Sequence, residues 1–168
     1  VYDTLFATDS DFRIRPQMAE GAEASADGRT WTIRLREGLK FHDNEPVRAQ
    51  DCIPSIRRWG ARDSFGQTLL AAVDDMNVVD DRTFQIKLKQ PFPLILDAIG
   101  KLSSQVCFVM PERHARLDPN TPVPEAIGSG PFRFLPREWV PGSMAAYEKF
   151  TGYVPRSEAP SWSAGGKV

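Results

Sequence analysis

The chain has 168 residues and a formal net charge of −1, because 21 Lys and Arg residues stand against 22 Asp and Glu residues. This length gives room for one ordinary domain with a core, and the charge balance leaves no positive field that would attract a nucleic-acid backbone or an anionic membrane. Hydrophobic residues make up 41% of the chain and charged residues 26%, which is typical of globular proteins and argues against disorder.

Both ends of the chain read as parts of secondary-structure elements. Residues 1–6 are predicted to be the last turns of a helix, and residues 163–168 a turn followed by the start of a strand. The sequence opens without Met and without a charged and then apolar leader pattern, so we expect a piece of a longer chain, cut at both ends. The longest nearly apolar run, residues 92–100, is far too short to span a bilayer.

Two segments, residues 27–38 and 82–89, alternate apolar and polar side chains with the period of a strand. Their apolar positions are Trp31, Ile33 and Leu35 in the first and Phe84, Ile86 and Leu88 in the second. A period of two places these side chains on one face of a sheet. We interpret the similarity as the shared chemistry of two half-buried hairpin strands, not as a duplication. Residues 14–24 are predicted to be irregular, and residues 76–79 a short strand that pairs with 82–89.

Helical patterns lie between and after these strands. The apolar positions Ala49, Cys52, Ile53 and Ile56 recur at helical spacing, and the opposite, polar face holds Gln50, Asp51, Ser55, Arg57 and Arg58. Because a proline is tolerated in the first turn of a helix, Pro54 places the start of this helix near residues 50–51. Further short helices are expected at residues 67–73, 93–99 and 112–117.

The last third of the chain is rich in proline and glycine. Residues 106–109 are predicted to be an apolar strand, residues 118–131 a long ordered loop, and residues 132–135 and 144–149 two strands joined by a turn at Pro141-Gly142. The whole pattern predicts the α+β class, with mainly antiparallel strands and inserted helices.

The residue types that carry catalysis or bind metals are sparse. Cys52 and Cys107 are too few for a cysteine metal cage and are expected to be two separate buried thiols, although one disulfide is the alternative. His42 and His114 lie far apart in the sequence, so we expect no metal site and no cofactor. Gly128-Ser129-Gly130 is too short for a nucleophile elbow, and residues 161–168 fail the pattern of a phosphate loop.

One aromatic and charged segment, residues 59–65, connects two predicted helices. It begins with Trp59, ends with Phe65 and contains Arg62 and Asp63. Such a loop could line a ligand cleft, or it could simply pack the two helices together. For Arg62 the alternative to a ligand contact is a solvated ion pair with Asp63 or another neighbour.

Three segments occur in a specific order. Residues 16–21 (Pro-Gln-Met-Ala-Glu-Gly) precede residues 27–43 (Asp-Gly-Arg-Thr-Trp-Thr-Ile-Arg-Leu-Arg-Glu-Gly-Leu-Lys-Phe-His-Asp), and residues 46–51 (Pro-Val-Arg-Ala-Gln-Asp) open a helix. This arrangement closely resembles extracellular solute-binding protein family 5, the peptide, opine and nickel receptors of bacterial ABC importers. The resemblance continues through residues 83–88, 127–132 and 147–153, and so covers nearly the whole chain.

The resemblance implies a binding protein and not a catalyst. Residues 1–168 would form part of lobe I, with its extra subdomain, of a two-lobe fold of the periplasmic binding protein type II-like class, with the second lobe absent. Such receptors close about a hinge on a ligand held between the lobes. One lobe alone would bind ligand weakly, and surface made for the absent segments would be exposed, which predicts self-association.

The resemblance also implies a site, partners and a location. Positions that face the cleft map to Arg62, Phe65, Ser103 and Ser104, with Trp59 added from the aromatic segment. Arg62 would pair with a ligand carboxylate, and Phe65 would stack on an apolar group. The expected partners are a peptide-like or other small solute and the permease subunits of an ABC transporter, in the periplasm after export through a signal peptide absent from this chain.

Two other functions remain open from the sequence. A hydrolase would use His42, Asp43 and Ser129, which must then lie within hydrogen-bond reach of one another. A β-rich interaction module without a small ligand would show no concave surface at Arg62 and Phe65.

Overall fold

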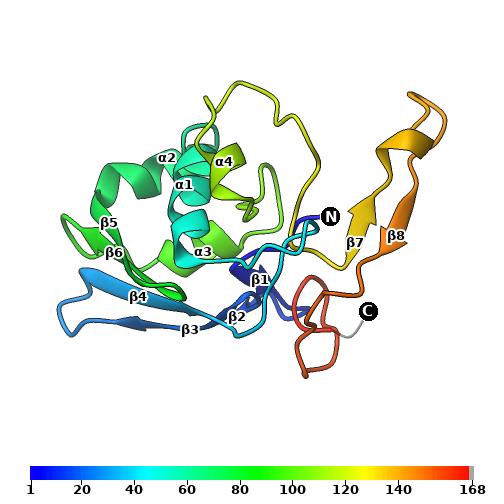
Figure 1. Ribbon diagram of the computed structural model, residues 1–168. Coiled ribbons are helices and arrows are strands. Elements are labelled where there is room, and N and C mark those ends of the chain that lie inside the picture. Colours follow the sequence, from blue (N-terminus) through cyan, green and yellow to red (C-terminus); the bar gives the residue numbers. More distant parts are fainter. Residues whose placement is uncertain (167–168) are drawn as a thin grey trace.

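The largest unit of the structure is a four-stranded antiparallel sheet, seen in a computed structural model that describes residues 1–166 (Figure 1). Its strands, in spatial order, are β3 (Ala19–Ala24), β4 (Thr30–Leu35), β6 (Thr83–Leu88) and β5 (Val73–Asp80). In the pairing of β4 with β6, Ile33 lies opposite Phe84 and Trp31 opposite Ile86. The two alternating segments predicted from the sequence are therefore confirmed as strands, and they are direct neighbours.

Helix α1 (Ala49–Gly60) packs on one face of this sheet, α2 (Ser64–Ala72) packs beside α1, and α3 (Ile95–Gly100) packs against α2 and the hairpin of residues 6–16. The core lies between the helices and the sheet, because the inward positions of both layers belong to one cluster of buried apolar side chains. Its fully buried members include Ile33, Leu35, Cys52, Ile56, Leu69, Phe84, Ile86 and Ile99. The apolar side chains at alternate strand positions and those at helical spacing in α1 therefore pack into the same core.

The polar face predicted for α1 is partly wrong. Asp51 and Ser55 are buried, not solvated. Asp51 accepts hydrogen bonds from the backbone N–H groups of Arg48 and Glu112, both at 2.8 Å, and the Ser55 hydroxyl contacts the N–H of Met110 at 3.1 Å. These two side chains therefore attach α1 to the segment that leads into α4 (Glu112–Ala115). A short helix at this position was expected, and it is confirmed.

The start of α1 agrees with the sequence to within two residues, but Pro54 does not lie in the first turn. The helix begins at Ala49, so Pro54 occupies the second turn. Extended backbone at Arg48 and the carboxylate of Asp51 cap the N-terminus. The helix tolerates this proline because its buried face packs on the sheet, so tertiary contacts outweigh one missing backbone hydrogen bond.

Three secondary-structure predictions, for residues 1–6, 14–24 and 106–109, are corrected. Residues 1–6 do not end a helix: β1 (Phe6–Thr8) pairs with β2 (Ile14–Pro16) in a small antiparallel hairpin. The segment 14–24, expected to be irregular, contains β2 and all of β3. Residues 106–109 form only one isolated bridge, from Phe108 to Thr4, and not a strand. Each conformation depends on a partner outside the segment, across a short loop for β1 and β2 and from distant chain for Phe108, and local propensity does not encode that partner.

The last third of the chain leaves the main body. Residues 118–131 form the expected long loop, followed by β7 (Phe132–Phe134), a 3-10 turn at Pro136–Glu138 and β8 (Tyr147–Lys149). β7 and β8 pair antiparallel, as expected, and Figure 1 shows them projecting from the body as an arm. The turn expected at the C-terminus is present as a bridge between Ser161 and Ala164. The strand expected after it falls partly on residues 167–168, which lie outside the described residues.

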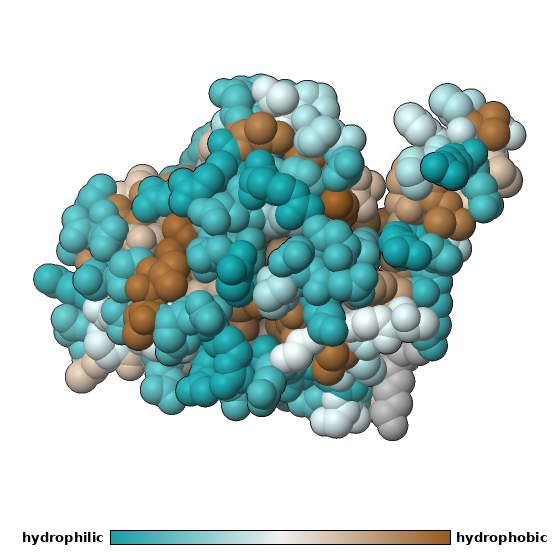
Figure 2. All heavy atoms as spheres, in the orientation of Figure 1, coloured by the Kyte–Doolittle hydropathy of each residue, from teal (hydrophilic) through white to brown (hydrophobic). Residues whose placement is uncertain are grey.

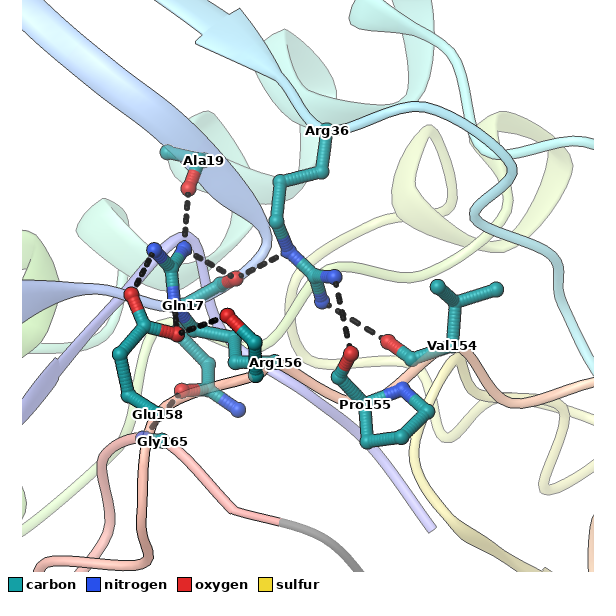
Figure 3. A network of polar contacts seen from close by, with 9 residues as sticks. Gln17, Ala19, Arg36, Val154, Pro155, Arg156, Glu158 and Gly165 are labelled. Carbon is teal, nitrogen blue, oxygen red and sulfur yellow. Dashed lines mark hydrogen bonds and ion pairs between the residues drawn. The ribbon is translucent and has the colours of Figure 1, made fainter.

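A network of polar contacts returns the C-terminal segment to the body (Figure 3). Arg36 donates from Nε to the carbonyl oxygen of Gln17 at 2.8 Å and from its terminal nitrogens to the carbonyls of Val154 and Pro155. Arg156 donates to the carbonyl of Ala19 at 3.1 Å and pairs with Glu158. Residues 154–158 are therefore held beside the start of β3 by arginine side chains that bind backbone carbonyls.

Both cysteines are buried and free, as expected from the sequence. Burial raises the pKa of the Cys52 and Cys107 thiols. Within residues 1–166, none of the helices has the length and apolar character needed to cross a membrane.

The central pairing of the sheet leads to a first prediction. Ile86→Ala should lower the free energy of unfolding by about 2–5 kcal/mol, because the fully buried side chain would leave a cavity between sheet and helices. The exposed neighbour variant Lys87→Ala should change it by less than about 0.5 kcal/mol. Urea denaturation measures both, and equal effects of the two variants would contradict the predicted layering.

Candidate functional site

A surface hollow of about 240 Å³ lies between the C-terminal half of α1 and the segment that follows α3. Its lining residues are Ser55, Arg58, Trp59, Arg62, Gln105, Val106, Phe108, Met110 and Pro119. Two of the predicted site residues, Trp59 and Arg62, belong to this lining. The structure thus places a concave surface at Arg62, whereas Phe65, the second residue at which the interaction module without a small ligand would show none, lies outside this lining.

The charge in the hollow comes from two arginines, and none of its lining residues is acidic. Arg58 uses three of its five N–H donors, because its terminal nitrogens donate to the carbonyls of Leu117 (2.7 Å), Asp118 (2.8 Å) and Thr121 (2.5 Å). Arg62 is exposed and makes one hydrogen bond, from NH1 to the carbonyl of Pro119 at 3.1 Å. The remaining donors of Arg62 can therefore serve an anion that enters the hollow.

Trp59 forms the buried wall of the hollow and is only 6% exposed. Its indole Nε1–H donates to the carbonyl of Gln105 at 2.6 Å, and the Lys101 ammonium lies 5.9 Å from the ring centroid. A Cβ atom at Gly66 would lie 3.1 Å from the Trp59 ring and 2.6 Å from the Gly60 Cα. Glycine at position 66 is therefore required for α1 and α2 to approach each other at this point.

Asp63 does not pair with Arg62, so that expected alternative for Arg62 is wrong. The buried carboxylate of Asp63 accepts from the Gly66 N–H at 2.9 Å, capping α2, and from the Lys101 ammonium at 2.5 Å. Burial acts to raise the pKa of Asp63, but the hydrogen bonds from Lys101 and Gly66 outweigh it and hold the pKa below its ordinary value. This pair fixes the loop after α3 to the junction of α1 and α2.

The other predicted site residues lie near the hollow but outside its lining. Phe65 is half-buried and packs against Phe92 with ring centroids 6.3 Å apart. Ser103 and Ser104 are exposed on the bend directly before Gln105, and Ser104 has φ of 63°, a left-handed conformation that is uncommon outside glycine. The segment 59–65 thus packs two helices together and contributes to a concave surface at once.

Several lining residues were not predicted from the sequence. Phe108 stacks on Tyr2 with centroids 5.5 Å apart, and Pro119 comes from the long loop. Nothing in the local pattern connects Pro119 with Arg62, because the two meet only through the path of the loop. Phe108 is the one aromatic residue of the apolar run 106–109. This position was the available sequence signal that Phe108 contacts another aromatic side chain.

The residues of the alternative hydrolase each have other partners. The Gly128 N–H donates to His42 Nδ1 at 3.3 Å, so His42 Nε2 carries the proton and donates to the Gly130 carbonyl at 2.9 Å. The buried Ser129 hydroxyl donates to the Met18 sulfur at 3.5 Å, and Asp43 pairs with Arg113 at 2.5 Å. Over residues 1–166 these side chains form no nucleophile–base pair, and His42 instead holds the 128–130 turn in place.

Groups of three or more His, Cys, Asp or Glu side chains able to hold a metal ion do not occur in the part of the chain that the structure describes.

Comparison with known proteins finds a matching family model and several relatives. The model of the bacterial extracellular solute-binding proteins, family 5 Middle, matches residues 13–166. A probable peptide ABC transporter periplasmic-binding protein of Sinorhizobium fredii is 44% identical over all of this chain and 31% of its own length. The glutathione-binding protein of Pectobacterium atrosepticum is 27% identical over 96% of this chain and 32% of its own length. The chain therefore spans about a third of the length of these relatives.

Solved structures agree in fold. AgaA of A. tumefaciens, in complex with agropinic acid, superposes with a TM-score of 0.71 at 27% identity, over 91% of this chain and 30% of the other. NikA of Brucella suis, in complex with Fe(III)-EDTA, gives 0.77 at 24% identity, over 96% and 32%. The α+β arrangement of antiparallel strands and inserted helices, expected from the sequence, is confirmed as the fold that these binding proteins share.

The buried ion pair leads to a second prediction. Lys101→Met should lower the free energy of unfolding by about 3 kcal/mol at pH 7, because it leaves the Asp63 carboxylate buried without its cation. As the pKa of Asp63 is lowered in the folded state, the contribution of the pair is present above the ordinary carboxyl pKa and is lost as the pH falls through the folded value. Denaturant titration from pH 7 to pH 3 should show the two proteins converging in acid. The exposed control Lys40→Met should follow the parent, and a constant difference across pH would contradict the assignment.

The role of His42 leads to a third prediction. Burial lowers the pKa of His42, so the unfolded chain binds a proton near the ordinary histidine pKa while the folded protein resists it. Stability is therefore full above pH 7 and declines as the pH falls toward 5. His42→Gln should reduce this slope and leave the part due to His114, whose pKa burial also lowers. If the dependence of stability on pH is unchanged in the variant, the pKa of His42 is the same in the folded and unfolded states.

Proposed function

The chain belongs to the bacterial extracellular solute-binding proteins of family 5, and from this premise we propose that it is part of the substrate-binding component of an ABC importer. It would capture a peptide-like or other small solute in the periplasm, after export through a signal peptide, and deliver it to membrane permease subunits. The family's members are solute-binding proteins, and the proposed role is accordingly binding without chemical change of the solute. Because the chain spans about a third of its relatives' length, the proposal concerns the whole protein.

We further propose that residues 1–168 form a partial lobe I, including its extra subdomain. The sheet β3-β4-β6-β5 with α1 and α2 would be the extra subdomain, and the β1–β2 hairpin would belong to the main part of the lobe. The division is suggested by the separation of the β1–β2 hairpin from the four-stranded sheet, and the relatives, each about three times as long as this chain, leave room for the rest of such a fold.

The proposed solute site is the hollow at Trp59 and Arg62, with Ser103 and Ser104 on the adjoining bend and Phe65 behind it. The observation that carries this proposal is Arg62, whose guanidinium has one hydrogen bond and stands in a lining without acidic residues. Such a group favours a carboxylate, which it can bind through two parallel hydrogen bonds. Peptides and glutathione, named for the two relatives, both carry carboxylates. Trp59 and Phe108 supply the apolar surface beside this charge.

Solute binding by the whole protein provides the fourth prediction. A screen by thermal shift should find a peptide-like ligand that stabilises the protein by about 2.7 kcal/mol when present at one hundred times its dissociation constant. Arg62→Ala should weaken the binding of that ligand roughly 10- to 100-fold, because it removes a charge-assisted hydrogen bond. It should have little effect on the C-terminally amidated form of the same peptide.

The matched control is Arg57→Ala, since Arg57 lies exposed on α1, five residues before Arg62, and outside the hollow. Isothermal titration of both variants with the free acid and the amide compares the four affinities. Equal losses for the free acid and the amide, or equal effects of the two arginine variants, would exclude Arg62 as the carboxylate partner.

A further inference from the structure

The segment that follows α3 divides its side chains between the core and the hollow at Arg62. Cys107 and Val109 are buried in the core, each with 1% of its surface exposed. The residues on either side of them line the hollow, namely Val106, Phe108 and Met110. These three side chains form an apolar wall, and the core side chains between them hold that wall in position.

Gln105 stands at the start of this wall with its main chain fixed and its side chain free. Its carbonyl oxygen accepts the indole N–H of Trp59 at 2.6 Å, and Ser104, directly before it, has a left-handed φ of 63°. A residue other than glycine keeps this conformation only where its surroundings determine it. Over residues 1–166 the exposed side-chain amide of Gln105 has no hydrogen-bond partner, although Gln105 lines the hollow. It therefore offers a carbonyl acceptor and N–H donors to an occupant.

The volume of the hollow limits the size of its occupant. At about 240 Å³ it is smaller than the roughly 300–1,000 Å³ of pockets that take a whole drug-sized molecule. It is larger than the apolar cavity of roughly 150 Å³ that holds one benzene ring. One amino-acid residue with a side chain of leucine size therefore fits, and the remainder of a longer solute must extend beyond the hollow.

The charge of the hollow decides which end of a peptide enters it. Its lining holds the guanidinium groups of Arg58 and Arg62 and no acidic side chain. Asp63, which follows Arg62 in the sequence, is bound to Lys101. A carboxylate is therefore attracted to the hollow, and an ammonium group is repelled. A charged side chain on the entering residue would have to leave water for the apolar wall, which costs free energy.

Apolar surface alone does not distinguish this place from the rest of the molecule. On the face shown in Figure 2, apolar residues lie in several separate patches within a mainly hydrophilic surface, including some on the arm formed by β7 and β8. Exposed apolar side chains of this kind are common on folded proteins. The hollow differs because an available guanidinium, an unpaired amide and an apolar wall line one and the same concave surface.

We propose that the hollow receives the carboxyl-terminal residue of a peptide-like solute and selects an apolar side chain at that position. Arg62 binds the terminal carboxylate, the Gln105 side-chain carbonyl accepts the N–H of the last peptide bond, and the wall at Phe108 receives the side chain. The inference rests on the proposed function, in which Arg62 is the carboxylate partner. It adds the orientation of the solute, the chemical class of its last residue, and two residues that determine specificity.

Tripeptide binding by the whole protein provides the fifth prediction. The probes are Ala-Ala-Leu, Ala-Ala-Gly and Ala-Ala-Asp, and isothermal titration measures their affinities. Ala-Ala-Leu should bind roughly 10-fold more tightly than the other two, because only its last side chain removes a large apolar surface from water. Phe108→Ala should reduce this preference to less than about 3-fold. The control Phe132→Ala removes a ring of similar exposure outside the hollow and should leave the preference unchanged.

An analogue of Ala-Ala-Leu tests Gln105. In this analogue an ester oxygen replaces the N–H of the last peptide bond, and the parent protein should bind it roughly 10-fold more weakly than the tripeptide. Gln105→Met keeps the length of the side chain and removes its amide. This variant should bind the tripeptide and the ester within about 2-fold of each other, because the interaction between the two groups is already lost. Gln90→Met is the control, since Gln90 is exposed and lies outside the hollow.

Equal affinities for the three tripeptides, or tighter binding of Ala-Ala-Asp, would overturn the proposal. A full preference for the tripeptide over the ester in Gln105→Met would overturn the role of Gln105. If none of the tripeptides binds, the proposal fails, whereas a solute of another class found by thermal shift leaves the importer role standing. Equal binding of Ala-Ala-Leu and its C-terminal amide would instead remove Arg62 as the carboxylate partner, and with it the proposed solute site.

Discussion

The antiparallel pairing of β4 with β6 is the contact on which the rest of the structure depends. It joins two strands separated by nearly fifty residues and places Ile33 against Phe84 in the core. The chain between them must leave one strand and return beside it, and the buried face of α1, which this chain contains, packs on the sheet. Loop closure of this length costs entropy, which the buried apolar area offsets.

From that arrangement the position of the hollow follows. The sheet sets the axis of α1, and the end of α1 carries Trp59 and Arg62 to one edge of the body. Lys101 then binds Asp63, and Gln105 accepts the indole hydrogen of Trp59, so the segment after α3 is drawn against the same edge. The concave surface is therefore made by two chain segments that are fixed to each other by one ion pair and one hydrogen bond.

The sequence predicted correctly the strands and the helix whose hydrophobic pattern is local and periodic. Alternation at residues 30–35 and 83–88 predicted both central strands, and helical spacing predicted α1 because each burial pattern is written within ten residues. The β1–β2 hairpin and the buried roles of Asp51 and Ser55 were missed, because each depends on a partner elsewhere in the chain. Of the five residues predicted for the site, Trp59 and Arg62 line the hollow, and Phe65, Ser103 and Ser104 do not. Phe108 and Pro119, which were not predicted, enter the lining through tertiary packing.

The hydrogen-bond partners of the arginine side chains explain why Arg62 keeps donors for a ligand. Arg36 and Arg156 are used to hold the C-terminal segment, and Arg58 spans three carbonyls of the long loop. A guanidinium satisfied by several carbonyls has few donors left for a ligand. Arg62 differs in its single hydrogen bond and in the diversion of its nearest carboxylate, Asp63, to Lys101. The same ion pair that orders the loop thus keeps the Asp63 carboxylate away from Arg62, and the hollow retains a positive group without an internal counter-ion.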